Sequence, residues 1–252
     1  MAIIASWNIN SVRIRVDILK RFIEEINPDI ILLQEIKCTN EEFPDFYTSF
    51  GYELIVNGQK GKYGVATLLK KGLNFKSIEL KNEILSCESR TNFIYVNEYN
   101  LNILNVYTPN GNPIEDKKKF NFKISWLSEI KKISKHFVNN VDNLLIAGDF
   151  NVLENKNDVL NFDDWTNDAL GCIESRTIFR EILSSGLTNI VRIFKKPGSS
   201  FSYWDYQRAC WERNDGLLID HFLISPRYLK LVKNINYILK NLSIYRKAYK
   251  SK

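Results

Sequence analysis

Short apolar runs rich in β-branched residues recur along the whole chain, and this pattern constrains the fold more than any other feature. Most of the runs are too short for helices and have the composition of buried strands. They cover residues 3–7, 30–33, 65–69, 94–96, 101–106, 144–147 and 217–224. Between them, apolar residues recur at helical spacing over residues 12–26, 120–137 and 178–183. This alternation predicts an α/β protein in layers, with helices outside and sheets packed face to face inside.

Several of the predicted strands run directly into an amide or a carboxylate side chain. These side chains are Asn8, Asn10, Gln34, Glu35, Asp149, Asn151 and Asp220. Each one alone is typical of a turn. Together, at one edge of a sheet, their oxygen atoms would suit a hard cation such as Mg²⁺. An oxygen-lined metal site of this kind is suited to the hydrolysis of phosphate esters.

The sequence lacks the motifs of several other catalytic chemistries. There is no phosphate-binding G-x-x-x-x-G-K-[ST] loop, no G-x-S-x-G nucleophile motif and no H-E-x-x-H zinc motif. The cysteines are scattered, which argues against a zinc site and a disulfide framework and predicts reduced thiols. They are Cys38, Cys87, Cys172 and Cys210. No internal repeat or linker is found, which indicates a single domain.

The start of the chain and its charge bear on location and partners. The opening MAIIASWNINSVR lacks a basic segment before its apolar residues, so we expect a first strand and no signal peptide. No apolar stretch approaches the roughly 20 residues of a membrane span, and the expected location is the cytoplasm. Residues 227–252 hold eight Lys or Arg and no Asp or Glu. The positive charge of this segment alone exceeds the net charge of +6 of the whole chain. The bulk charge is therefore no evidence of a basic patch on the body.

A series of longer motifs extends from residue 2 to about residue 240. They are SWNINSVRIR (6–15), LQEIK (33–37), GQKGKYGVA (58–66), NVYTPNGNP (105–113), AGDFNV (147–152), WTNDALGCIESRTIFREIL (165–183), FSYWDYQRACW (201–211) and RNDGLLIDHFLISP (213–226). In order and spacing they closely resemble the exonuclease III branch of the endonuclease/exonuclease/phosphatase superfamily, the abasic-site endonucleases of base-excision repair. The resemblance implies a four-layer α/β sandwich, in which two packed mixed β-sheets are flanked by helices.

The resemblance also implies roles for individual residues. It places metal ligands, for Mg²⁺ or Mn²⁺, at Asn8, Glu35, Asp149 and Asn151. It assigns catalytic roles to Tyr107, Asp149, Asn151 and Asp220. In this assignment Glu35 is the metal carboxylate, and Asp149 orients or protonates groups at the reaction centre. Tyr107 contacts the phosphate.

The DNA-binding residues follow from the same resemblance. For backbone contacts and the abasic pocket they are Arg13, Lys37, Asn110, Tyr203, Asn214, Leu217 and Ile219. Lys62 is a further candidate for a backbone phosphate. A sugar without its base can be recognised only by its shape and its apolar surface, so an apolar pocket wall suits it. It is also extruded easily from the duplex, because its base pairing is already lost. The implied partner is double-stranded DNA with abasic sites or 3′ ends, bound by a monomer.

The sequence departs from the family at its C-terminal end. The family closes with a Ser-Asp-His-x-Pro turn and a last apolar strand, and this chain shows neither. We therefore expect the domain to span residues 1–242 without the last strand, followed by a divergent basic tail at 243–252. Either a premature stop or frameshift, or a native tail that holds DNA, would give this pattern. A further departure is Leu218, where the family commonly has Arg.

The two histidines do not replace the missing one. His136 lies in a helical stretch and is expected on its surface. His221 follows Asp220 in a strand, and adjacent strand side chains point to opposite faces, so His221 is not expected to share the pocket of Asp220.

Three functions are consistent with the sequence. The first is a Mg²⁺-dependent DNA repair nuclease of the exonuclease III type, which cuts 5′ to abasic sites and trims 3′ ends. The second is a catalytically impaired relative that binds DNA without efficient turnover, since loss of a general base typically costs about 10²–10⁴ in rate. The third keeps the superfamily and changes the substrate to a sugar or lipid phosphate; the FSYWDYQ and LQEIK motifs argue against it.

Overall fold

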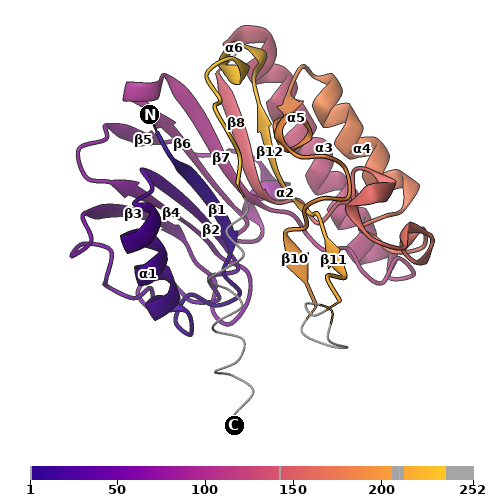
Figure 1. Ribbon diagram of the computed structural model, residues 1–252, viewed down its shortest axis with the longest axis horizontal. Coiled ribbons are helices and arrows are strands. Elements are labelled where there is room, and N and C mark those ends of the chain that lie inside the picture. The colour runs from indigo at the N-terminus through magenta and orange to yellow at the C-terminus, as the bar shows by residue number, and fades with distance from the viewer. Residues whose placement is uncertain (1, 142, 206–209, 211–212, 237–252) are drawn as a thin grey trace.

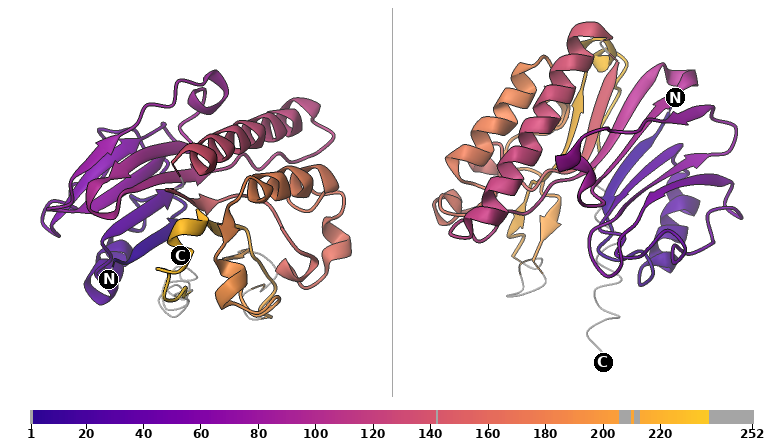
Figure 2. Two further views of the ribbon diagram at one scale, coloured as in Figure 1. Left: turned by 90° about the horizontal axis from the view of Figure 1, so that it is seen from above. Right: turned by 180° about the vertical axis from the view of Figure 1, so that it is seen from behind.

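The computed structural model describes residues 2–141, 143–205, 210 and 213–236. Two large β-sheets pack face to face, and helices cover the outer side of each (Figures 1 and 2). The predicted four-layer α/β sandwich is confirmed.

The first sheet has four strands in the order β1-β2-β4-β3. They are β1 (Ile4–Asn8), β2 (Ile30–Gln34), β4 (Val65–Lys70) and β3 (Tyr52–Asn57). The β1 and β2 strands are parallel, and the other pairs are antiparallel. Within the described part of the chain β1 is an edge strand, and all five of its residues are half-buried, whereas those of β2 are buried.

The second sheet has six strands in the order β5-β6-β7-β8-β12-β9. They are β5 (Phe75–Ser77), β6 (Thr91–Val96), β7 (Leu101–Tyr107), β8 (Leu144–Asp149), β12 (Asp220–Ile224) and β9 (Thr188–Asn189). The central β7 and β8 strands are parallel, and the remaining pairs are antiparallel.

The predicted single strand over residues 217–224 is wrong, because the chain divides it between two sheets. Its start belongs to β11 (Gly216–Leu217), which pairs with β10 (Tyr203–Trp204) in a small separate sheet. Its end forms β12. Between them Leu218 N–H donates to the Asp158 carbonyl, and the N–H groups of Ile219 and Asp220 donate to the Ser202 hydroxyl. Local apolar composition cannot show this change of partner.

Three helices form the outer layers at the positions that periodicity predicts. The first sheet is covered by α1 (Val16–Ile26), and the second by α3 (Lys117–Asn140) and α4 (Ile173–Ser184) (Figure 1). Shorter helices are α2 (Glu83–Ser86), α5 (Val191–Phe194) and α6 (Pro226–Leu229), with 3₁₀ turns at Asn97–Tyr99, Lys156–Asp158 and Phe162–Trp165. The first helix begins later than the predicted residue 12.

The unbroken apolar sequence of β2 is explained by burial on both of its faces. Ile30 and Leu32 pack between the two sheets, against Ile103 and Leu145 of the second sheet. Ile31 and Leu33 pack on the opposite side, with the apolar face of α1. The strands are thereby fixed in the middle of the sandwich, and their polar ends are held at one edge.

Some expectations fall outside the described residues. The missing last strand, the boundary at residue 242 and the tail at 243–252 all concern residues 237–252, which the structure does not describe. Of the helices it does describe, none has the length and apolar character to cross a membrane. All four cysteines are free, as predicted.

Candidate active site

The polar strand ends predicted from sequence meet at one edge of the sandwich. The parallel strands β1 and β2 end at Asn8 and Gln34, and the parallel strands β7 and β8 end at Tyr107 and Asp149. Because β12 runs antiparallel to β8, its first residue, Asp220, lies opposite Asp149. Residues far apart in sequence are thus brought together by the topology of the sheets.

Asn8 joins the two sheets at this edge. Its Nδ2 donates to Glu35 Oε1 and to Asp149 Oδ2, each at 2.9 Å. Its Oδ1 accepts the backbone N–H of Asn10 at 3.1 Å. A single amide therefore holds a carboxylate from each sheet.

Glu35 is kept ionised by its partners. It adopts a left-handed backbone conformation, with φ of 52°, directly after β2. Its Oε2 forms an ion pair with Lys37 Nζ at 2.8 Å. Burial alone would raise the pKa of Glu35, but the hydrogen bonds from Asn8 and Lys37 and the charge of Lys37 lower it below its ordinary value.

Tyr107 is almost completely buried beside these carboxylates. Burial, followed by the charges of Glu35 and Asp149, raises its pKa far above the ordinary value, so the phenol stays protonated. The guanidinium of Arg90 lies over the Tyr107 ring at 4.6 Å and over the Tyr63 ring at 3.9 Å. Arg90 and Tyr63 were missed from sequence, because a lone arginine and a glycine-flanked tyrosine give no periodic signal.

Asp149 and Asn151 form a tight turn at the end of β8. Asn151 N–H donates to Asp149 Oδ1 at 2.9 Å, and Asn151 itself is left-handed, with φ of 49°. Its side-chain Nδ2 donates to the Thr108 carbonyl at 2.9 Å, and its Oδ1 lies 3.5 Å from Asn110 Nδ2. Burial raises the pKa of Asp149, although hydrogen bonds from Asn8 and Asn151 oppose the shift.

Asp220 faces Asp149 and has a raised pKa. Burial is the larger cause, and the negative charge of Asp149 is the next. Its Oδ1 is buried and accepts no hydrogen bond from any residue that the structure describes. Two acidic side chains at adjacent strand positions thus compete for ionisation.

These side chains resemble an open cation site, in which the protein supplies only some of the metal ligands, more than a site that the protein encloses completely. Among the described residues no group of three or more His, Cys, Asp or Glu side chains is placed to hold a metal by itself. The carboxylates of Glu35 and Asp149 are nevertheless drawn to one amide, and amide oxygens lie nearby. Mg²⁺ commonly uses one or two protein carboxylates and completes its shell with water and substrate phosphate. The residues present fit that mode of binding.

The predicted phosphate-contacting cations lie around the rim. Arg13 donates to the Lys37 carbonyl at 3.2 Å and pairs with Glu42 at 3.4 Å. Lys37 Nζ also donates to Asn10 Oδ1 at 2.6 Å, and exposed Lys62 lies 5.0 Å from the Tyr63 ring centre. Arg13 and Lys37 are therefore together beside Glu35.

The residues predicted for the abasic pocket divide into two groups. Leu217 and Ile219 are buried in an apolar cluster with Leu153. Tyr203 pairs with Leu217 across β10 and β11 and is 40% exposed. Asn214 is also exposed, in the segment that precedes β11. Of the exposed members, Tyr203 thus lies beside buried Leu217.

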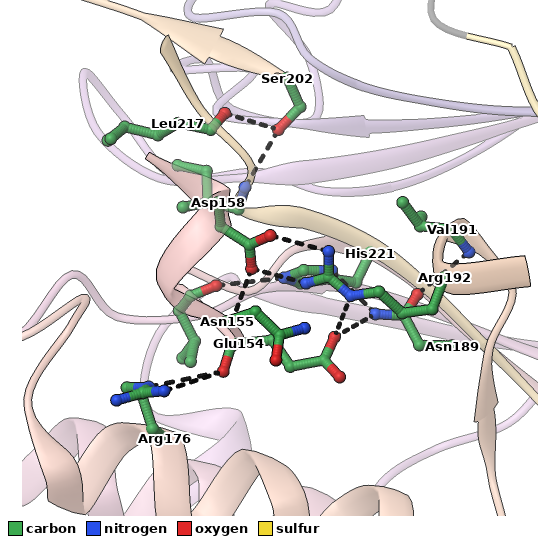
Figure 3. Close-up of polar contacts among 12 residues, drawn as sticks. Glu154, Asn155, Asp158, Arg176, Asn189, Val191, Arg192, Ser202, Leu217 and His221 are labelled. Carbon is green, nitrogen blue, oxygen red and sulfur yellow. Dashed lines mark hydrogen bonds and ion pairs between the residues drawn. The ribbon is translucent and has the colours of Figure 1, made fainter. Parts of the chain in front are cut away.

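A buried ionic network holds this region together (Figure 3). The Arg192 guanidinium donates to Asp158 Oδ1 at 2.7 Å and Oδ2 at 2.5 Å, and to Glu154 Oε2 at 2.7 Å. The Asp158 carbonyl accepts Leu218 N–H at 2.8 Å. Arg192 therefore fixes the segment between the Asp149 turn and the Leu217–Ile219 wall.

The histidines are placed as the sequence predicts. His136 is exposed on α3. His221 is fully buried and points away from Asp220, with Nε2 at 3.1 Å from the Val152 carbonyl and Nδ1 at 3.1 Å from Asn189 Nδ2. A carbonyl only accepts and an amide nitrogen only donates, so His221 is the neutral tautomer with its proton on Nε2. It is a structural residue of the network in Figure 3 and does not reach the site.

Comparison with known proteins gives consistent matches over most of the chain. The model of the endonuclease/exonuclease/phosphatase family matches residues 5–239. Exodeoxyribonuclease III of Haemophilus influenzae is 30% identical over 237 residues, which cover 88% of this chain and 87% of that protein.

Solved structures share the fold. An AP endonuclease from Archaeoglobus fulgidus superposes with a TM-score of 0.82 at 27% identity, covering 91% of this chain and 89% of the other. A 3′ phosphatase from Neisseria, bound to a product DNA hairpin, also gives a TM-score of 0.82 at 27% identity, covering 90% and 88%.

Proposed function

Because the chain belongs to the endonuclease/exonuclease/phosphatase family, on its exodeoxyribonuclease III branch, we propose that it is a metal-dependent DNA repair nuclease. It hydrolyses the phosphodiester 5′ to abasic sites in duplex DNA and trims 3′ ends. The relatives that are named an exodeoxyribonuclease, an AP endonuclease and a 3′ phosphatase support a DNA phosphoester as substrate. The domain spans residues 1–242, acts as a monomer and works in the cytoplasm.

The observation that carries the proposal is the double hydrogen bond of Asn8. It draws Glu35 and Asp149, one carboxylate from each sheet, to a single amide at 2.9 Å. Drawing two carboxylates together is electrostatically costly unless a cation or a donor lies between them. A divalent cation, Mg²⁺ or Mn²⁺, held by Glu35, Asn8, Asp149 and Asn151, would neutralise charge on the attacked phosphate and on the leaving oxygen.

The protein's own groups supply the remaining functions. Asp149 lies where it can orient a water and move its proton, and its raised pKa suits that role. Tyr107, which burial keeps protonated, donates a hydrogen bond to the attacked phosphate or to the leaving oxygen. Asn151 and Asn110 hold the phosphate from the other side. Arg13, Lys37 and Lys62 contact the DNA backbone.

The baseless sugar binds against the exposed ring of Tyr203 and the apolar wall formed by Leu217 and Ile219. Asn214 contacts the DNA beside them. Support for this assignment comes from the pairing of Tyr203 with Leu217, which puts an exposed ring above a buried apolar floor.

A second candidate is a relative that binds DNA with little turnover, because residues 1–252 contain no Ser-Asp-His motif. The observation in its favour is Asp220, whose buried Oδ1 accepts no hydrogen bond from any residue in the described part of the chain. In this reading the pocket and the cation site persist, and the proton transfer is slow.

One assay separates the two candidates. The substrate is a duplex oligonucleotide with one abasic-site analogue, incubated with Mg²⁺ or with EDTA, and Glu35→Ala and Asp149→Ala serve as controls. The nuclease predicts nicking that Mg²⁺ supports and that both substitutions abolish. Selective binding of the abasic duplex without nicking would favour the second candidate, and neither binding nor nicking would reject both.

A further inference from the structure

Lys123 is a charged residue on the buried face of a helix. It lies in α3 at the helical spacing of Phe120, Leu127 and Ile130, and its side chain is fully buried. The site described above does not use it. The helical spacing predicts an apolar face here, and a lysine in the middle of such a face is a signal of an internal role.

The amine of Lys123 donates to three backbone carbonyl oxygens. They belong to Asn110 at 3.0 Å, Asn151 at 2.7 Å and Ala169 at 2.7 Å. A protonated lysine has three N–H donors and no acceptor, so three carbonyl acceptors satisfy it completely. The geometry therefore matches a buried ammonium whose partners are all main-chain atoms.

These three carbonyls come from three separate segments of the site. Asn110 belongs to the segment that follows β7, Asn151 to the turn after β8, and Ala169 to the segment before α4. The side chains of Asn110 and Asn151 lie 3.5 Å apart. The lysine thus bridges the backbones of two residues assigned to the phosphate.

The segment that follows β7 packs closely against the Lys123 side chain. A Cβ at Gly111 would come within 2.6 Å of Lys123 Cδ, and Gly111 has a φ of +86° that favours glycine. The segment after β7 therefore lies directly on the aliphatic part of the Lys123 side chain. A shift of the lysine would move this segment.

We propose that Lys123 is a positioning residue, whose ammonium holds the Asn110 and Asn151 segments at the spacing that the reaction requires. The proposal rests on the proposed nuclease function. It concerns catalysis more than binding, because misplacement of reacting groups by about 1 Å can cost about 100-fold in rate. The DNA-binding rim of Arg13, Lys37 and Lys62 lies on other segments.

The test compares Lys123→Met with the wild type on the abasic duplex and on a 3′-recessed duplex, with kcat and KM measured separately. We expect kcat to fall about 100-fold while KM changes by less than about 3-fold. The folded fraction is measured first by circular dichroism, so that every rate refers to folded protein. A folded Lys123→Met protein with wild-type kcat would overturn the proposal.

Two control variants separate positioning from stability. Ser175→Ala removes another buried donor to the same Ala169 carbonyl, at 2.6 Å, and leaves the Asn110 and Asn151 contacts intact. It should lower the melting temperature and keep kcat. Lys131→Met removes a half-exposed lysine of the same helix that pairs with Glu181, and it should change neither. A fall of kcat in Ser175→Ala as large as in Lys123→Met would also overturn the proposal.

A second variant covers the case in which Lys123→Met does not fold. Lys123→Gln keeps two N–H donors, and it should show an intermediate loss of kcat. If neither variant folds, Lys123 serves stability and the positioning role is rejected. Failure of the nuclease function itself is distinguishable, because the wild type would then cleave neither duplex.

Discussion

Asp149 and Asp220 lie directly opposite each other in the antiparallel β8–β12 pair, at the edge where both sheets end. Burial raises the pKa of both carboxyl groups, and the negative charge of Asp149 adds to the rise at Asp220. Hydrogen bonds from Asn8 and Asn151 oppose the rise at Asp149. Burial would also raise the pKa of the neighbouring Glu35, but hydrogen bonds from Asn8 and Lys37 and the charge of Lys37 lower it. This separation of protonation states within one cluster is typical of acid–base sites.

Asn8→Ala tests the amide that joins the two sheets. The substitution removes the donor shared by Glu35 and Asp149, so the two carboxylates repel each other and separate. We expect kcat to fall by about 100-fold with the fold intact. Steady-state cleavage of the abasic duplex measures the effect. A variant with kcat close to wild type would show that the shared amide has no role in the reaction.

Glu35→Gln tests the cation site. Loss of a carboxylate ligand should raise the Mg²⁺ concentration for half-maximal cleavage at least about 10-fold, since even outer-shell changes cost 10–100-fold in metal affinity. The matched control is Glu42→Gln at the rim, which pairs with Arg13 and should leave that concentration unchanged. Equal Mg²⁺ dependence of the two variants would remove Glu35 from the metal site.

Much of this arrangement follows from the sequence, for a physical reason. The strands β1, β2 and β8 are mostly apolar, so the polar residues at their ends stand out, and parallel neighbours bring those ends to one edge. Asn8, Glu35 and Asp149 were predicted in this way. The opposite orientation of His221 and Asp220 followed from the two-residue period of a strand.

Other parts of the site depend on tertiary contacts that no local pattern records. The stacking of Arg90 on Tyr107 joins residues 17 positions apart. The division of residues 217–224 between two sheets depends on Ser202 and Asp158, which accept the backbone N–H groups at the break. Lys123 was not singled out from the sequence, because the carbonyls that satisfy it come from three distant segments.

Arg192→Met tests the buried ionic network. Removing the arginine leaves the buried Asp158 and the half-buried Glu154 without their cation. Breaking a buried pair in this way typically costs about 3–5 kcal/mol of unfolding free energy. Urea denaturation measures the loss, and Arg213→Met, which removes an exposed pair with Asp215, should cost less than about 1 kcal/mol. Similar losses in the two variants would contradict the role assigned to Arg192.

The lowered pKa of His221 predicts that the unfolding free energy falls at acidic pH. Burial, and then the charge of Arg192, lowers the pKa of His221 in the folded protein below the 6.5 of a free imidazole, and the nearby Glu154 and Asp158 oppose the shift only in part. The unfolded chain therefore binds a proton first as pH falls. The stability that His221 contributes is complete above about pH 6.5 and declines below it, by at most about 1.4 kcal/mol per pH unit.

The matched variant is His221→Gln, which keeps one donor and one acceptor and does not titrate. The difference in unfolding free energy between wild type and His221→Gln should narrow as the pH is lowered from 7 to 5. Urea denaturation at each pH measures it. A difference that stays constant over this range would mean that His221 does not titrate differently in the folded and unfolded states.

If this cluster directs water to a DNA phosphorus, cleavage in H₂¹⁸O under single-turnover conditions places ¹⁸O on the new phosphate end. The substrate is a duplex with one natural abasic site, which keeps the sugar aldehyde, incubated with Mg²⁺, and mass spectrometry identifies both new ends. We expect a 3′-hydroxyl and a 5′-phosphate that carries one ¹⁸O, with no product from Glu35→Ala or Asp149→Ala. Absence of cleavage, or a 3′-unsaturated aldehyde end without ¹⁸O, would contradict it.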